Sequence, residues 1–177
     1  MKKIYLYIVI GLVAACTPHN KPTRPTTIQQ VDSIYTESKF CLYGDYYNSG
    51  HQVYAIDLLS EGLDYDSTGH IIGTGCNLYL SDIFVPKDST KRLPAGRYEM
   101  DSVAKDMRFL RGMYFDGSVT GAYLLMIQDS QIQRIILLKR GTMTIKYVED
   151  DVFLDFNLYL ADSTRYHCTY TGSVIYR

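Results

Sequence analysis

The sequence lacks the patterns of several common protein classes. It holds four cysteines but no Cys-x-x-Cys pair, which disfavours a zinc ribbon and a thioredoxin-like redox site. It has no block of lysine and arginine, and its formal net charge is −1. Because affinity for nucleic acid depends mainly on clustered basic residues, we expect no nucleic acid partner.

Catalytic and metal-binding motifs are also absent. No serine stands in a Gly-x-Ser-x-Gly elbow, and the four histidines do not have the short spacing of a helical metal motif. We therefore predict no catalytic residues, no metal site and no cofactor. A hydrolase site assembled from separated Ser, Asp and His residues stays open as the alternative, because its members need only be neighbours in the fold.

The N-terminus is the most informative part of the chain. Lys2 and Lys3 open an apolar run that is too short to span a bilayer as an anchor, and Val13-Ala14-Ala15 stand immediately before Cys16. The last four of these residues resemble the end of a bacterial lipoprotein signal, in which the cysteine is lipidated and becomes the new N-terminus. The resemblance implies a signal peptide over residues 1–15, removed on export, and a membrane anchor of fatty acid (palmitate) on Cys16.

The following segment is rich in proline and polar residues. Pro18, Pro22 and Pro25 stand among Thr, Asn, Gln and Lys, a composition that buries too little apolar surface to offset the entropy of ordering. We therefore predict that residues 16–37 form the lipidated cysteine and a flexible tether. Residues 38–177 have a length that fits one folded domain.

The folded part shows a period of two, which is typical of strands with one buried face. In the clearest case polar residues alternate with five apolar ones, Val152, Leu154, Phe156, Leu158 and Leu160. Short connections join antiparallel neighbours. The pattern predicts an all-β domain, an antiparallel two-sheet sandwich of about nine strands. A partly closed, calycin-like β-barrel is the alternative, since it buries the same faces around its interior.

The first half of the domain is less regular than the second. Its strands are expected at 42–47, 53–59, 75–85 and 97–102. The stretch 103–121 fits an irregular loop, a bulged strand or a single helical turn. Because long connections in compact domains are often functional, we expect a binding surface there.

Three cysteines remain after Cys16, and an odd number cannot all pair within the chain. Free cysteine is among the most buried residue types, so we interpret Cys41, Cys76 and Cys168 as small buried side chains. One disulfide is the alternative in an oxidising compartment. Cys76 to Cys168 is then the expected pair, because both fall on the apolar phase of expected strands.

Tyrosine gives the main hint of a ligand site. Tyr43, Tyr46 and Tyr47 precede a turn, and Tyr65 lies in or near the next one. A tyrosine has a flat apolar body and a polar tip, which suits stacking on sugars or contact with a partner protein. Filling the rim of a β core is the structural alternative. The segment 64–69 resembles the start of a calcium loop but lacks its final carboxylate, so we expect a plain hairpin loop.

Three segments together resemble a widespread type of small secreted lipoprotein in Bacteroidetes. They are Leu93-Pro94-Ala95-Gly96-Arg97-Tyr98, Gly141-Thr142-Met143-Thr144-Ile145 and Tyr170-Thr171-Gly172. The resemblance implies an all-β domain in the cell envelope and carries over no catalytic residue.

The residues after Cys16 bear on the location within the envelope. In that type, lipoproteins sent to the outer face tend to have acidic residues just after the cysteine, and residues 17–21 have none. The resemblance therefore favours the periplasmic face of the outer membrane. We interpret the protein as a non-catalytic binding or accessory module for a glycan or an envelope protein.

Overall fold

The computed structural model describes residues 33–176, which contain strands and turns. None of these residues forms a helix that is long and apolar enough to cross a membrane. The predicted signal peptide, Cys16 and the tether up to residue 32 lie outside the described residues. The strands are β1 (Ser33–Gly44), β2 (His51–Ser60), β3 (Leu63–Tyr65), β4 (Ile71–Gly73), β5 (Gly75–Pro86), β6 (Gly96–Asp101), β7 (Arg108–Leu110), β8 (Met113–Phe115), β9 (Ser118–Thr120), β10 (Ala122–Gln128), β11 (Gln131–Val148), β12 (Asp151–Leu160), β13 (Arg165–Gly172) and β14 (Ile175–Tyr176).

The main sheet closes on itself. Its strand order is β10-β11-β12-β13-β1-β2-β5-β7-β6, and β14 pairs with β1. Two further pairings, β10 with β5 and β11 with β6, join the two ends of this order. The shortest closed circuit runs through five strands, β5, β7, β6, β11 and β10. The all-β class is thus confirmed, but the two-sheet sandwich is not. Long strands are the reason, because β5 and β11 each pair with different neighbours along their length and so connect what would be separate sheets.

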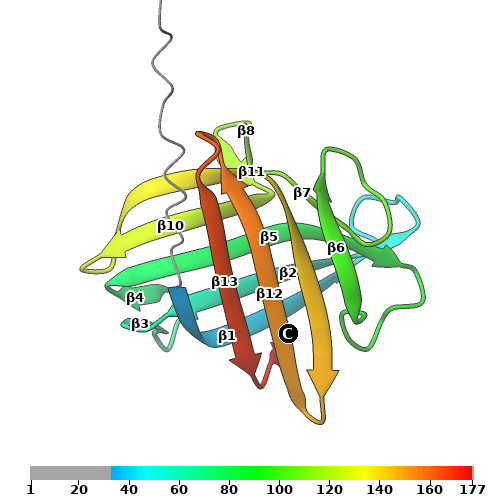
Figure 1. Cartoon of the computed structure of the whole chain (residues 1–177), viewed down its shortest axis with the longest axis horizontal. Coiled ribbons are helices and arrows are strands. Elements are labelled where there is room, and N and C mark those ends of the chain that lie inside the picture. Colours follow the sequence, from blue (N-terminus) through cyan, green and yellow to red (C-terminus); the bar gives the residue numbers. More distant parts are fainter. Residues whose placement is uncertain (1–32, 177) are drawn as a thin grey trace, which may run out of the picture.

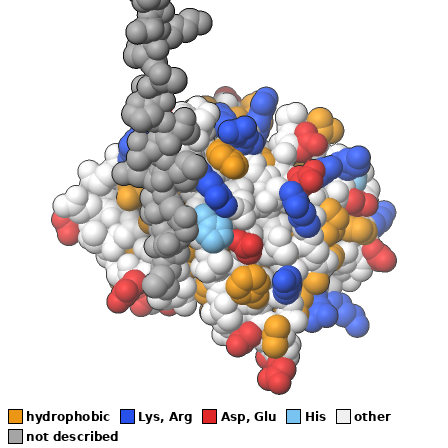
Figure 2. Space-filling model, in the orientation of Figure 1, with side chains coloured by type: hydrophobic (Ala, Val, Ile, Leu, Met, Phe, Trp, Pro, Cys, Tyr) orange, Lys and Arg blue, Asp and Glu red, His pale blue; other side chains and the backbone are white. Residues whose placement is uncertain are grey.

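The closed sheet is flattened into two walls (Figure 1). We call β6, β11, β12 and β13 the front wall, and β1, β2, β5 and β10 the back wall. The side chains between the walls are almost completely buried and come from alternate residues, among them Ile56, Leu58, Leu78, Leu80, Leu154, Phe156 and Leu158. This burial confirms the predicted period of two and fills the interior with apolar side chains. On the face viewed in Figure 2, acidic and basic side chains are interspersed.

The purely antiparallel expectation is wrong at three pairings. Strand β1 runs parallel to β13 and β14, and β6 runs parallel to β7. The prediction rested on connection length, which restricts only strands that follow one another in the chain. β1 and β13 are neighbours in the sheet but lie near opposite ends of the sequence, so this restriction does not apply to them. The β6–β7 pairing has a short connection but covers only three residue pairs.

The fold begins earlier than predicted. β1 starts at Ser33, and Tyr35 is buried in the core with 4% exposure. Residues 33–37, which we assigned to the tether, therefore lie in a strand. The prolines upstream dominated the composition of that window, and the short apolar stretch Ile34-Tyr35 was too weak a signal against them.

The strands expected at 53–59, 75–85 and 97–102 match β2, β5 and β6 closely. The strand expected at 42–47 is shifted, because β1 ends at Gly44 and a turn follows. The number of strands exceeds the expected nine because several strands have only three residues, which is too few to show a periodic pattern in the sequence. Three of these, β7, β8 and β9, account for much of the irregular stretch 103–121.

Candidate functional site

Polar and aromatic side chains cross the outer face of the back wall in one row. Lys39 on β1 lies opposite Asp57 on β2, Asp57 lies opposite Tyr79 on β5, and Tyr79 lies opposite Tyr123 on β10. Directly opposed residues in a sheet share a face, and these positions alternate with the core residues of the same strands. The row therefore places two tyrosines and a carboxylate side by side, outside the apolar interior.

The end of β1 and the turn after it add three more tyrosines to this face, Tyr43 on β1 and Tyr46 and Tyr47 in the turn. The Asp45 carboxylate accepts hydrogen bonds from the backbone N–H of Ser49 at 2.7 Å and of Gly50 at 3.1 Å. Asn48 has a positive φ of 52°, a conformation that asparagine adopts more readily than most residues. These local bonds fix the turn that carries Tyr46 and Tyr47.

The rings of these three tyrosines form a contiguous cluster. The ring centroids of Tyr43 and Tyr46 are 6.4 Å apart, and those of Tyr46 and Tyr47 are 5.0 Å apart in an edge-to-face arrangement. The Tyr47 ring also packs at 5.9 Å from Phe84 of β5. Phe84 is almost completely buried, so it ties the exposed cluster to the wall.

A β-bulge in β5 supplies the polar floor. Tyr54 pairs with Ile83 and Ile56 pairs with Leu80, so Ser81 and Asp82 together oppose one residue of β2. A bulge of this kind re-aims side chains locally, and here both residues reach the outer face. Asp82 is only 5% exposed.

The Asp82 carboxylate accepts hydrogen bonds from several donors. Tyr47 Oη donates to Oδ1 at 2.5 Å, and the Ser81 hydroxyl donates to Oδ2. Thr120 Oγ1 and the backbone N–H of Gly121 lie 3.5 Å and 3.3 Å from Oδ2. The carboxylate is thus held in one orientation by the turn, by β5 and by β9.

Gly121 joins β9 to the bulge, and the position requires glycine. Its φ is +76°, and a Cβ added there would lie 2.2 Å from the carbonyl oxygen of Arg111. Its N–H donates to Ser81 Oγ at 2.7 Å, while its carbonyl accepts from the Ser81 N–H at 3.1 Å. The close approach places Thr120 beside the bulge.

These elements enclose a hollow of about 420 Å³, here called the tyrosine hollow. It is lined by Tyr43, Tyr46, Tyr47, Val53, Tyr79, Ser81, Asp82, Val119, Thr120 and Tyr123. The lining contains no lysine, arginine or histidine. Its volume lies within the range of small-molecule sites, which is about 300–1,000 Å³.

Tyr79 and Tyr123 form the wall side of the tyrosine hollow. Their ring centroids are 5.3 Å apart, and the hydroxyl of Tyr79 lies 3.5 Å from that of Tyr43. Burial raises the pKa of Tyr123 to about 12, and the nearby Asp57 carboxylate adds to the effect. Burial likewise raises the pKa of Tyr79 far above its ordinary value. Both hydroxyls therefore stay protonated and can donate hydrogen bonds at neutral pH.

Three of the four tyrosines named from the sequence, Tyr43, Tyr46 and Tyr47, line the hollow, and Tyr65 does not. Tyr65 Oη donates to Asp57 Oδ2 at 2.5 Å, and Asn77 Nδ2 donates to the other carboxylate oxygen. The Lys39 ammonium lies over the Tyr65 ring. Burial raises the pKa of Asp57 despite the two hydrogen bonds and the nearby Lys39, which lower it. Tyr65 thus belongs to a partly buried polar cluster beside the hollow.

The segment 64–69 lies in the expected hairpin: Asp64 and Tyr65 end β3, and the rest of the segment forms most of the loop that leads to β4. The Asp66 carboxylate accepts hydrogen bonds from the N–H of Thr68 at 2.8 Å and of His70 at 2.9 Å, which closes the loop. Among residues 33–176, no group of three His, Cys, Asp or Glu side chains is placed to hold a metal ion. A second hollow of about 450 Å³ lies beside this hairpin and is mostly apolar, with Leu125, Ile127 and Ile132 in its lining.

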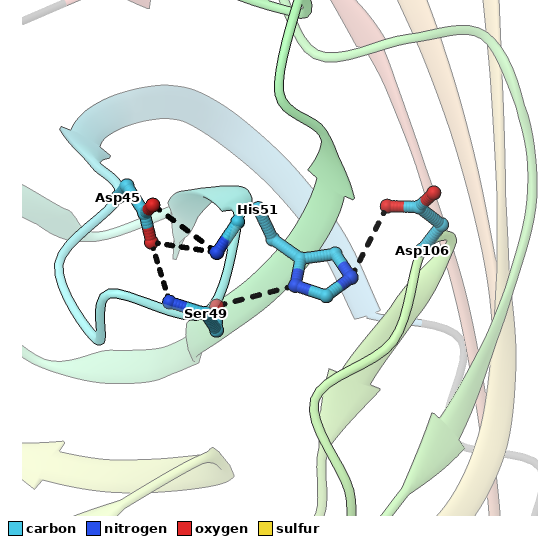
Figure 3. Close-up of polar contacts among 5 residues, drawn as sticks. Asp45, Ser49, His51 and Asp106 are labelled. Carbon is cyan, nitrogen blue, oxygen red and sulfur yellow. Dashed lines mark hydrogen bonds and ion pairs between the residues drawn. The ribbon is translucent and has the colours of Figure 1, made fainter.

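A serine, a histidine and an aspartate meet at the end of the β1–β2 turn (Figure 3). His51 Nδ1 lies 3.2 Å from Ser49 Oγ, and His51 Nε2 lies 3.5 Å from Asp106 Oδ1. This order of groups is that of a nucleophile, a base and an orienting acid. The backbone N–H groups of Ser49 and Gly50 already donate to Asp45, so this turn offers neither of them to an oxyanion.

Cys76 and Cys168 carry free thiols, so the alternative of a disulfide between them is not what the structure shows. Cys168 is buried as expected, whereas Cys41 and Cys76 are half-buried. The thiols of Cys76 and Cys168 nevertheless share neighbours. Tyr35 Oη lies 3.9 Å from Cys76 Sγ and is hydrogen-bonded to the hydroxyl of Tyr166. Burial raises the pKa of both thiols, so they are protonated and act as packing groups.

Several lining residues were not found from the sequence. Tyr123, Ser81, Asp82 and Thr120 come from strands far from the β1–β2 turn, and nothing local connects them to it. The one available signal was the adjacent pair Ser81-Asp82 inside an otherwise apolar strand, which is typical of a bulge.

Comparison with known proteins adds no relative to this picture: the chain matches no family model, no curated protein and no solved structure at a significant level.

Proposed function

We propose that the protein is a non-catalytic binding or accessory module of the cell envelope that binds a glycan in the tyrosine hollow. The observation that carries this proposal is the gathering of five tyrosine rings around one buried carboxylate. The apolar face of a sugar packs on aromatic rings, while its hydroxyl groups donate to carboxylates and accept from phenols.

The shape of the site supports a glycan more than a protein partner. The hollow is concave and holds about 420 Å³. A stable protein interface instead buries about 800 Å² on each partner. The ring edges at the rim, with Tyr46 69% exposed, suit the next sugar of an oligosaccharide that extends out of the hollow.

The proposal includes attachment to the membrane. The lipoprotein-like residues before Cys16 support a lipid anchor on that cysteine and a location in the outer membrane, facing the periplasm. An anchored module keeps its ligand at the membrane surface. Metabolic labelling with radioactive palmitate should mark the wild-type protein and leave Cys16→Ser unlabelled; label on the variant would reject the anchor.

The binding test is calorimetric titration of the domain with oligosaccharides of two to four sugars. Tyr79→Ala and Tyr123→Ala should each weaken binding about tenfold or more, because each ring supplies a stacking surface. The matched control is Tyr159→Ala, which removes a ring that stacks on Arg140 of the front wall. A wild-type protein that binds no oligosaccharide, or a control variant that binds as weakly as the others, would reject the proposal.

An envelope hydrolase is the second candidate, and the contact of Ser49, His51 and Asp106 favours it (Figure 3). In that mechanism the imidazole takes the proton of the Ser49 hydroxyl as the oxygen attacks an ester carbonyl. The ester C–O bond then breaks, the proton passes to the leaving alcohol, and water hydrolyses the acyl-serine. The test is hydrolysis of a nitrophenyl acetate ester. Activity that is lost in both Ser49→Ala and His51→Ala would support this candidate, and equal rates for wild type and Ser49→Ala would reject it.

A further inference from the structure

The tyrosine hollow carries a negative charge without a cationic partner of its own. All the groups that contact the Asp82 carboxylate are donors without positive charge, namely two side-chain hydroxyls of β5 and β9, one phenol and one backbone N–H. Among residues 33–176, Asp82 forms no ion pair, and no residue that lines the hollow is basic. A charge so buried gains strongly from an opposite charge brought within reach.

The aromatic lining reinforces this negative field. The face of a tyrosine ring carries negative electrostatic potential, and several rings around one space form a cage for a cation. Asp57 also lies near Tyr79 and Tyr123 and helps to raise the pKa of both phenols, but the nearby Lys39 offsets its charge. Every group that lines the hollow is itself neutral or negative, which disfavours a ligand with carboxylate or sulfate groups.

Tyr47 marks the place where such a ligand would reach the carboxylate. Tyr47 is 48% exposed, and its hydroxyl donates to Asp82. The other donors, Ser81 and Gly121, belong to the strand framework and hold Asp82 in place whether or not Tyr47 does. A ligand N–H can thus replace the Tyr47 hydroxyl and leave the carboxylate oriented.

Building on the proposed glycan-binding function, we propose that the glycan carries a positively charged amino group, held between the tyrosine rings and the Asp82 carboxylate. The chemical class is an amino sugar with a free amine. N-acetylated and neutral sugars of the same size are weaker ligands, and sugars with acidic groups are excluded.

The test compares three oligosaccharides of equal length by calorimetric titration. They are a β-1,4-linked glucosamine oligomer, its N-acetylated form and a uronic acid oligomer, each at a pH where the free amine is protonated. The amine form should bind at least about tenfold more tightly than the N-acetylated form, since a charged hydrogen bond and cation–π contacts are both lost on acetylation. The uronic acid oligomer should not bind.

Variants test whether the charge of Asp82, and not the size of its side chain, sets the preference for the amine. Asp82→Asn should bring the ratio of the two affinities close to one, while binding of the N-acetylated form remains. Asp155→Asn, which removes a carboxylate from the front wall, should leave the ratio unchanged. The ratio in wild-type protein is informative even if Asp82→Asn does not fold.

The outcomes distinguish this inference from the function on which it rests. Equal or tighter binding of the N-acetylated oligomer would overturn the inference and leave glycan binding standing. Binding of none of the three oligomers would overturn both. A preference for the amine that persists in folded Asp82→Asn would place the selectivity elsewhere and reject the role of this carboxylate.

Discussion

The outer faces of the two walls are built from similar strands but differ in solvent access. On the front wall, His167 Nε2 lies 2.9 Å from Asp155 Oδ1, and the two side chains remain 28% and 34% exposed. The surface viewed in Figure 2 carries charges of both signs. On the back wall, Asp82 and Lys39 are 5% and 8% exposed, and burial raises the pKa of Asp57.

The difference arises from what covers each wall. The β3–β4 hairpin packs Leu63 on Leu59 and Ile127, and the β1–β2 turn and β9 border the bulge. Alternation within a strand places polar groups on an outer face, but only connections that fold back over that face bury them. The candidate site is thus a product of the covering segments as much as of the strands.

The largest expected difference in stability is between substitutions on the two faces of one strand, β12. Phe156 of β12 is completely buried between the walls, whereas Phe153 lies on the outer face of the same strand and is half-buried. Phe156→Ala should lower the free energy of unfolding by about 3–5 kcal/mol, because it leaves a cavity in the core. Phe153→Ala should cost less than about 1 kcal/mol. Urea denaturation measures both, and equal losses would contradict the assignment of the two faces.

A smaller effect should distinguish the two outer faces. Tyr65→Phe removes a donor from the half-buried Asp57 carboxylate and should cost about 1–3 kcal/mol, since a carboxylate with little access to water is costly to leave without a donor. Tyr159→Phe on the front wall keeps the ring that stacks on Arg140 and should cost less than about 0.5 kcal/mol. Urea denaturation should show this order, and similar costs would argue against a partly buried cluster on the back wall.

The pH dependence of stability should report the burial of Asp57. Its pKa is raised above the ordinary value of 3.8, so the folded state binds the proton more tightly than the unfolded state. Stability from this group is present below that ordinary value and is lost as pH rises through the folded-state pKa. Asp57→Asn lacks this loss, so its unfolding free energy should improve relative to wild type as pH rises from about 3 to 7. A difference that is constant across this range would contradict the raised pKa.

A small effect should also come from the partly exposed pair of Asp155 and His167 on the front wall. Asp155→Asn weakens the contact with His167 but leaves the strand intact. A pair with this exposure contributes about 0–1 kcal/mol, so thermal unfolding should change by only a few degrees. A loss as large as that of Tyr65→Phe would remove the contrast between the two walls.

The strands were predictable because the signal is local. Leu154 is buried and Asp155 is not, and the alternation that places them on opposite faces is visible in the sequence. The tyrosines at 43, 46 and 47 were found for the same reason, since they stand beside a turn of Asn, Ser and Gly. Their role as ligand-binding residues stays a prediction.

The site residues and strand contacts that were not predicted depend on pairings between strands far apart in the sequence. Tyr123 reaches Tyr79 only because β10 pairs with β5, and no local pattern specifies that pairing. The parallel contact of β1 with β13 was missed for the same reason. Asp82 joins the site through a bulge and through Gly121, both of which became visible only with the register known.

The parallel pairing of β1 with β13 and β14 has a practical consequence for protein engineering. The described chain enters at Ser33, level with Cys168, and leaves at Tyr176, level with Phe40. Entry and exit are therefore displaced along the strand direction by about seven residues, roughly 23 Å. A circular permutant that joins these two points needs a linker of at least about seven residues. A shorter linker could not span the distance without disrupting the pairing of β1 with β13 and β14.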